Sequence, residues 1–125
     1  MTKIPALTVS TINLSAPDPS ALAHFYQRLL GMTVGEEEPD WVVLRSPTGG
    51  IALAFQSEAH YTRPVWPPTA TDQQMMMHLE IRTDDLEAAV AQAVSLGATV
   101  AEFQPQEDVR VCLDPAGHPF CLWVG

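Results

Sequence analysis

Two segments of the chain carry apolar residues at helical spacing, and short segments rich in β-branched and other apolar residues lie on either side of each. Over 18–31 the apolar stripe consists of Leu22, Phe25, Tyr26 and Leu29. Over 85–96 it consists of Leu86, Ala89, Val90 and Ala93. This period of three to four residues predicts two amphipathic helices. Asp18-Pro19 is a typical helix start, and Gly31 a typical helix end.

The remaining apolar segments are short and predict β-strands. In the first half they lie near 7–14, 32–37, 41–45 and 51–56, and in the second half near 75–82, 98–103, 108–113 and 118–124. Each half therefore has the predicted order β-α-β-β-β. The proline-rich segment between them breaks regular structure and predicts a loop.

The two halves repeat each other at a nearly constant offset. Asp18 and Asp85 are 67 residues apart, and Gly31 and Gly97 are 66 apart. Such a duplication indicates two similar units that share one core, with a site at their junction. We expect a single domain over 1–125, with module 1 at 1–57, a linker at 58–74 and module 2 at 75–125.

Composition narrows the function. The 125 residues are 46% hydrophobic, which is enough for the core of one ordinary domain. Fifteen acidic against six basic residues give a net charge of −9, which argues against nucleic acid and anionic membranes as partners. No segment is long and apolar enough for a signal peptide or a membrane span, so we expect a cytoplasmic protein. Strand alternation places Cys112 and Cys121 on opposite faces, so no disulfide is expected.

Several fixed motifs resemble one superfamily. They are the Asp-Pro…Phe-Tyr…Leu-Gly helix at 18–31, the Asp-Pro-Ala-Gly-His turn at 114–118 and the His-Leu-Glu-Ile strand at 78–81. The chain resembles the glyoxalase / bleomycin-resistance / extradiol-dioxygenase (vicinal oxygen chelate) superfamily, and most of all its small bacterial glyoxalase-like domains. The resemblance implies an α+β fold in which two βαβββ modules form a half-open barrel with the helices outside.

The resemblance also implies where a metal would be held. Metal-dependent members use inward-facing His, Glu or Gln side chains from the first and last strands of each module. Counting from the two helix starts and the two turns places these positions at Thr11, Leu53 or Ala54, His78 and Cys121. Because catalytic metal sites generally need three protein ligands, we expect no cofactor and no metal here. Asn13, Gln56 or Glu80 would replace the missing ligands only in a different register, which leaves a divalent ion as the alternative.

His78 and Glu80 are the candidate catalytic pair. His78 is either a ligand contact or general base, or a histidine that only fills the barrel. Glu80 could set the tautomer of His78, meet a cationic ligand, or form a salt bridge with Arg45 or Arg110. Cys121 is expected to pack rather than act as a nucleophile.

The candidate ligand-binding residues lie on the predicted barrel strands. They are Thr11, Asn13, Trp41, Gln56, Met76, Cys121 and Trp123. The two tryptophans could stack on a flat ligand or pack in a core or an interface. In the linker, His60, Tyr61, Arg63 and Trp66 are either a lid over the pocket or a dimer contact. His24 and His118 are expected to be exposed.

Three functions stay open. The first is a protein that binds a small organic molecule between the modules without the usual metal tetrad. The second is a metal-dependent lyase, isomerase or dioxygenase of the glyoxalase type. The third is a metal-independent enzyme that uses His78 and Glu80. Unpaired strand edges in the modules also predict a homodimer. The long linker would permit the two chains of such a dimer to exchange modules.

Overall fold

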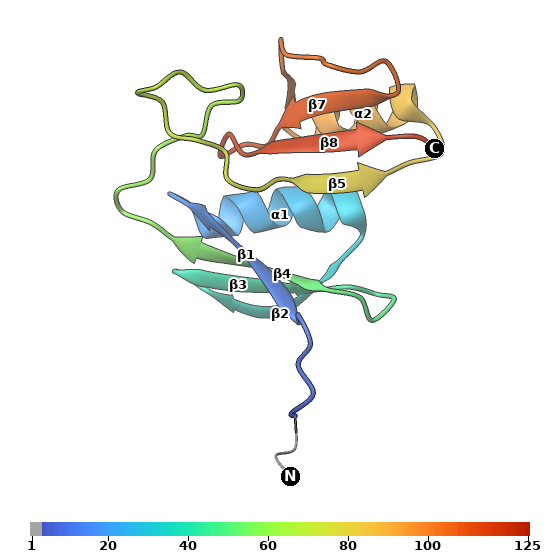
Figure 1. Ribbon diagram of the computed structural model, residues 1–125. Coiled ribbons are helices and arrows are strands. Elements are labelled where there is room, and N and C mark those ends of the chain that lie inside the picture. The colour runs from blue at the N-terminus through green and yellow to red at the C-terminus, as the bar shows by residue number, and fades with distance from the viewer. Residues whose placement is uncertain (1–3) are drawn as a thin grey trace.

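Two four-stranded sheets, each with its own helix, form residues 4–125, which are the residues that the computed structural model describes (Figure 1). The first half contains β1 (Thr11–Ala16), α1 (Pro19–Leu30), β2 (Thr33–Glu38), β3 (Trp41–Arg45) and β4 (Ala52–Ser57). The second half contains β5 (Leu79–Arg82), α2 (Leu86–Ser95), β6 (Thr99–Val100), β7 (Val109–Leu113) and β8 (Pro119–Trp123). Over residues 4–125 the predicted α+β fold of two βαβββ modules is confirmed, with two separate sheets and no closed barrel.

Both sheets have the same plan. Their strand orders are β1-β4-β3-β2 and β5-β8-β7-β6, and the first and last strands of each module pair in parallel. Ile12 faces Leu53 in the first sheet, and Leu79 faces Phe120 in the second. Leu79 lies 67 residues after Ile12, and Phe120 lies 67 residues after Leu53. The duplication seen in the sequence is therefore a duplication of strand register.

The helices begin where their capping residues predict. The Asp18 carboxylate accepts a hydrogen bond from the Ala21 amide at 3.2 Å, and Asp85 accepts one from Ala88 at 3.1 Å. These bonds satisfy amides that have no partner within the helix. Gly31 then ends α1 with a left-handed φ of 66°, which costs a glycine little.

Strands β1, β5 and β6 are shorter than predicted, and in each case the pairing with another strand or a side chain from elsewhere sets the bounds. Residues 7–10 lie before the start of β4, which runs parallel to β1, so β1 begins only at Thr11. Pro119 has no amide donor, and β5 pairs from Leu79 rather than from residue 75. Beyond β6, the Gln104 side chain bonds both the amide and the carbonyl of Val111 at 3.0 and 2.9 Å. A side chain thus takes the place of the missing strand.

A single apolar core joins the modules. Helix α1 lies between the two sheets, and its Tyr26 ring lies 5.9 Å from Phe55 of β4 and 6.1 Å from Phe120 of β8 (Figure 1). Each sheet therefore has one face toward this core and one face turned away from it. Among the described residues, neither helix combines the length and apolar character required to cross a bilayer.

Candidate functional site

The predicted site residues of module 2 share the face of its sheet that is turned away from the core. Leu79 and Ile81 pack against the core, so strand alternation places His78 and Glu80 on the other face. Glu80 lies opposite Cys121 in the pairing of β5 with β8, and Arg82 lies opposite Trp123. The structure thus brings together His78, Glu80, Cys121 and Trp123.

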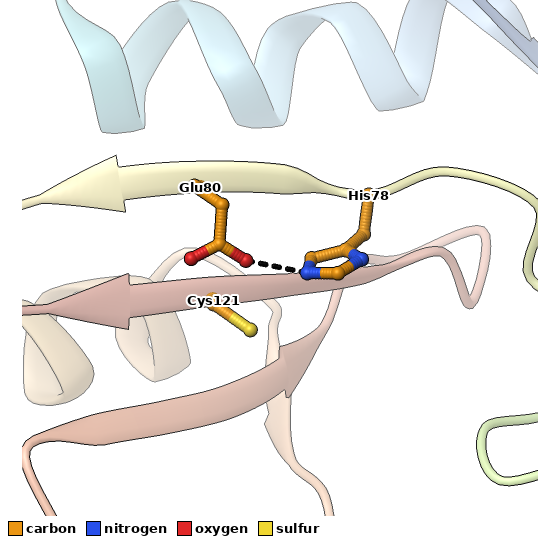
Figure 2. Close-up of side chains that lie close together, drawn as sticks. All are labelled: His78, Glu80 and Cys121. Carbon is orange, nitrogen blue, oxygen red and sulfur yellow. Dashed lines mark hydrogen bonds and ion pairs between the residues drawn. The ribbon is translucent and has the colours of Figure 1, made fainter.

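His78, Glu80 and Cys121 form a close cluster on this face. The imidazole Nε2 of His78 is hydrogen-bonded to the Glu80 carboxylate, and one ligand atom from each of the three side chains lies within 4.8 Å of the others (Figure 2). Glu80 thereby fixes the orientation of the His78 ring, as one of the sequence alternatives stated. The arginine alternative is not observed for Arg110, whose guanidinium donates to the backbone carbonyls of Gln106 and Glu107.

The two cysteines lie on opposite faces, as alternation predicts, and both are free thiols. Burial and the neighbouring Glu80 carboxylate raise the pKa of the Cys121 thiol to about 12. Burial alone raises the pKa of Cys112, within the core, to about 11. A protonated thiol is a poor nucleophile, so the structure gives Cys121 no activation for covalent catalysis.

The linker covers His78. The Trp66 ring lies 4.8 Å from the His78 ring and 5.2 Å from Phe103. Nearby, the Tyr61 hydroxyl donates to the carbonyl of Ala116 at 2.9 Å, which ties the linker to the turn before β8. The sequence did not identify Phe103 as a contact of this site, because it follows a short strand and belongs to no recognisable motif.

The predicted site residues of module 1 lie on the outer face of the first sheet. Asn13 donates to the Gln56 side chain at 3.1 Å, and Gln56 donates to Ser15 at 3.0 Å. The indole of Trp41 donates to Glu36 at 3.1 Å. Beside this polar ladder is an open hollow of about 420 Å³ lined by Thr11, Asn13, Glu36, Trp41, Val43 and Arg45.

A second hollow of about 410 Å³ lies on the other side of Asn13, between β1 and the linker. Its walls include Tyr61, His118 and Met76. Met76 was predicted on a strand, but it lies before β5 and is 79% exposed. The candidate residues are thus divided between the outer faces of the two sheets. Both hollows lie beside module 1, and Asn13 lines each of them.

A buried polar network holds the modules together, and sequence reasoning missed it. The Tyr26 hydroxyl of α1 donates to Asp114 at 2.7 Å, and Asp114 also accepts from the amides of Ala116 and His118. The prediction that His118 is exposed was wrong: its Nε2 donates to the Ser15 carbonyl of β1 at 2.7 Å. Burial raises the pKa of the Asp114 carboxyl, and burial together with Asp114 raises that of Tyr26.

In this chain, the residues at the four positions that hold a metal in the superfamily are not a suitable set of metal ligands. The observed register places Ala54 in the position equivalent to Cys121, whereas Leu53 packs in the core. The set is therefore Thr11, Ala54, His78 and Cys121. A methyl group offers no donor atom, and the threonine hydroxyl is a weak ligand, so this set lacks the three ligands of a catalytic metal site.

The sequence matches the family called Glyoxalase-like domain over residues 11–123. The chain therefore belongs to this family, within the vicinal oxygen chelate superfamily. No curated protein is a significant match to the sequence.

Solved structures share the fold at low sequence identity. A glyoxalase/bleomycin resistance protein/dioxygenase family enzyme from Burkholderia phytofirmans PsJN has a TM-score of 0.72 at 18% identity, with 94% of this chain and 98% of that chain covered. A possible glyoxalase from Bacillus cereus has a TM-score of 0.68 at 16% identity, with 94% and 99% covered. TnmS3, an antibiotic binding protein from Streptomyces sp. CB03234, has a TM-score of 0.62 at 18% identity, with 98% of both chains covered.

Proposed function

We propose that the protein binds a small organic molecule on its outer sheet faces, without the metal tetrad of the superfamily's enzymes. The observation that carries this proposal is the hollow beside Trp41, which combines an aromatic ring, a carboxylate, a guanidinium and a side-chain amide. Its volume of about 420 Å³ is in the range of small-molecule sites.

The walls of the hollow carry one charged group of each sign, Glu36 and Arg45, so the excess of acidic residues over the whole molecule is what favours a flat, positively charged ligand. The Trp41 indole can stack on a ring and attract a cation, and Glu36 supplies a negative charge beside it. The net charge of −9 adds a favourable long-range field. TnmS3 gives independent support at the level of the fold, because an antibiotic binding protein has the same architecture.

Thermal unfolding against a panel of cationic and anionic aromatic compounds tests this proposal. A cationic ligand at a hundred times its dissociation constant should stabilise the protein by about 2.7 kcal/mol. Trp41→Ala should weaken that ligand about tenfold, whereas Trp41→Phe, which keeps a stacking ring, should weaken it less. The control is Val94→Ala on α2, an exposed apolar residue outside both sheet faces, which should leave this affinity unchanged. A panel without any stabilising compound would contradict the proposal.

The His78–Glu80 hydrogen bond favours a second candidate, a metal-independent enzyme that uses this pair for acid–base catalysis. Turnover of a bound compound should then survive chelators. It should fall by about 10²- to 10⁴-fold in His78→Ala. Equal turnover in the variant and the parent protein would exclude this role.

We also propose that the protein works as a homodimer that forms along the open edges of β1 and β5. Within residues 4–125, β1 pairs only with β4 and β5 only with β8, so each keeps one open edge. Exposed apolar side chains lie next to these edges in the sequence, among them Leu7, Met76 and Met77. Open edges and apolar patches of this kind are usually covered in an assembly.

A further inference from the structure

We propose that His78, Glu80 and Cys121 bind one divalent ion of borderline softness, with Zn²⁺ as the expected ion. The site lies entirely within module 2 and uses Glu80, which occupies none of the superfamily's four ligand positions. The inference does not depend on the small-molecule proposal, whose hollow lies on module 1.

The strand register places the three side chains around one point. Glu80 and Cys121 are direct partners on adjacent strands, and His78 precedes Glu80 by two residues on the same face. Figure 2 shows the Glu80 carboxylate pointing at the His78 ring, with Cys121 on the neighbouring strand. One ligand atom from each of the three side chains lies within 4.8 Å of the others. Ligand atoms around a tetrahedral Zn²⁺ are about 3.3–3.8 Å apart, given bond lengths of about 2.0–2.3 Å.

An ion can enter only if the Glu80 carboxylate moves away from His78, because these two groups are in direct hydrogen-bond contact. The Glu80 side chain is 53% exposed and the His78 side chain is 24% exposed. Rotation of Glu80 would replace its direct hydrogen bond to His78 with a shared ion. The Trp66 ring packs against His78 with ring centres 4.8 Å apart and the planes tilted by 31°, which helps to hold the imidazole in place.

The donor set selects the class of ion. One imidazole nitrogen, one thiolate sulfur and one carboxylate oxygen form a mixed set that suits Zn²⁺ or Co²⁺ and does not suit Mg²⁺ or Ca²⁺. An ion releases the thiol proton when it binds. The charges of thiolate and carboxylate then balance the double positive charge. Three protein ligands leave a fourth position of a tetrahedral ion open on the exposed side of Glu80.

Titration of metal-free protein with Co²⁺ tests the site, because a bound thiolate gives a charge-transfer absorption in the near ultraviolet. The band should saturate at one ion per chain. Cys121→Ser should abolish it, and Cys112→Ser should retain it, since Cys112 is the other free thiol and lies in the core. Glu80→Gln and His78→Gln should each weaken Co²⁺ binding at least about tenfold.

Circular dichroism of each variant checks that it is folded. If Cys121→Ser does not fold, the Glu80→Gln variant decides, because its side chain is exposed. The proposal is overturned if the parent protein gives no band at stoichiometric Co²⁺, if folded Cys121→Ser keeps the band, or if Glu80→Gln binds Co²⁺ as tightly as the parent. Binding of a cationic aromatic ligand to module 1 would be unaffected by any of these results.

Discussion

Asp114 is the residue on which the joint between the modules depends. Its carboxylate is 2% exposed and accepts three hydrogen bonds, from the Tyr26 hydroxyl and from two backbone amides. A buried carboxylate is tolerated only when its oxygens are bonded. The sequence marks Asp114 as part of a turn motif, but only the packing of α1 against that turn brings Tyr26 to it.

Tyr26→Phe should therefore destabilise the protein by about 1–3 kcal/mol, because it leaves a buried acceptor short of a partner. Urea unfolding monitored by fluorescence measures this cost. Tyr61→Phe is the matched control, since the Tyr61 hydroxyl is half-buried and donates to a neutral carbonyl. The control should cost less, and an equal or smaller loss in Tyr26→Phe would show that the contact adds nothing.

At the scale of helices and strands, the sequence was sufficient where the determining interactions are local. Both helices begin at their aspartate caps, and strand alternation places His78 and Glu80 on the face away from the core. The prediction from sequence failed where a partner strand or a distant side chain determines the bounds of an element. The late start of β1 depends on where β4 begins, and the short β6 depends on Gln104. The contact of Trp66 with His78 likewise depends on the path of the linker.

The two caps give matched measurements of local stability. Asp18→Ala and Asp85→Ala should each lower the free energy of unfolding by about 0.5–2 kcal/mol, because each removes an acceptor for a helix amide. Asp84→Ala is the control, since Asp84 is exposed and precedes the cap. Its change should stay within about 0.5 kcal/mol. Chemical denaturation of the three variants gives the comparison, and equal losses in all three would refute the role of the caps.

On the scale of the whole molecule, the separation of the two candidate faces is the main feature that the sequence did not reveal. The duplication and the superfamily motifs predicted both modules, and they predicted one shared site. The structure instead turns both faces away from the common core, because α1 lies between the sheets (Figure 1). How the two modules are oriented depends on contacts within their common core, such as that of Tyr26 with Phe120, which leave no pattern in the sequence.

A charge introduced beside the open edge of β5 should disrupt the proposed homodimer. Met77 is 73% exposed and precedes β5. Met77→Glu should raise the dissociation constant of the dimer at least about 100-fold, because a buried, unpaired carboxylate is costly at an interface. Light scattering across a dilution series measures it. Val94→Glu on α2, an apolar residue 46% exposed, should leave the assembly intact. A parent protein that is monomeric at all concentrations would contradict the proposal.

The equal register of the two modules makes each half an internal reference for the other. Thr11 and Ala54 occupy the backbone positions in the first sheet that His78 and Cys121 occupy in the second. The supporting strands run in the same order and direction. A difference in what the two faces hold then arises from the side chains on them and from the linker that covers His78, since the strand order and register beneath them are the same.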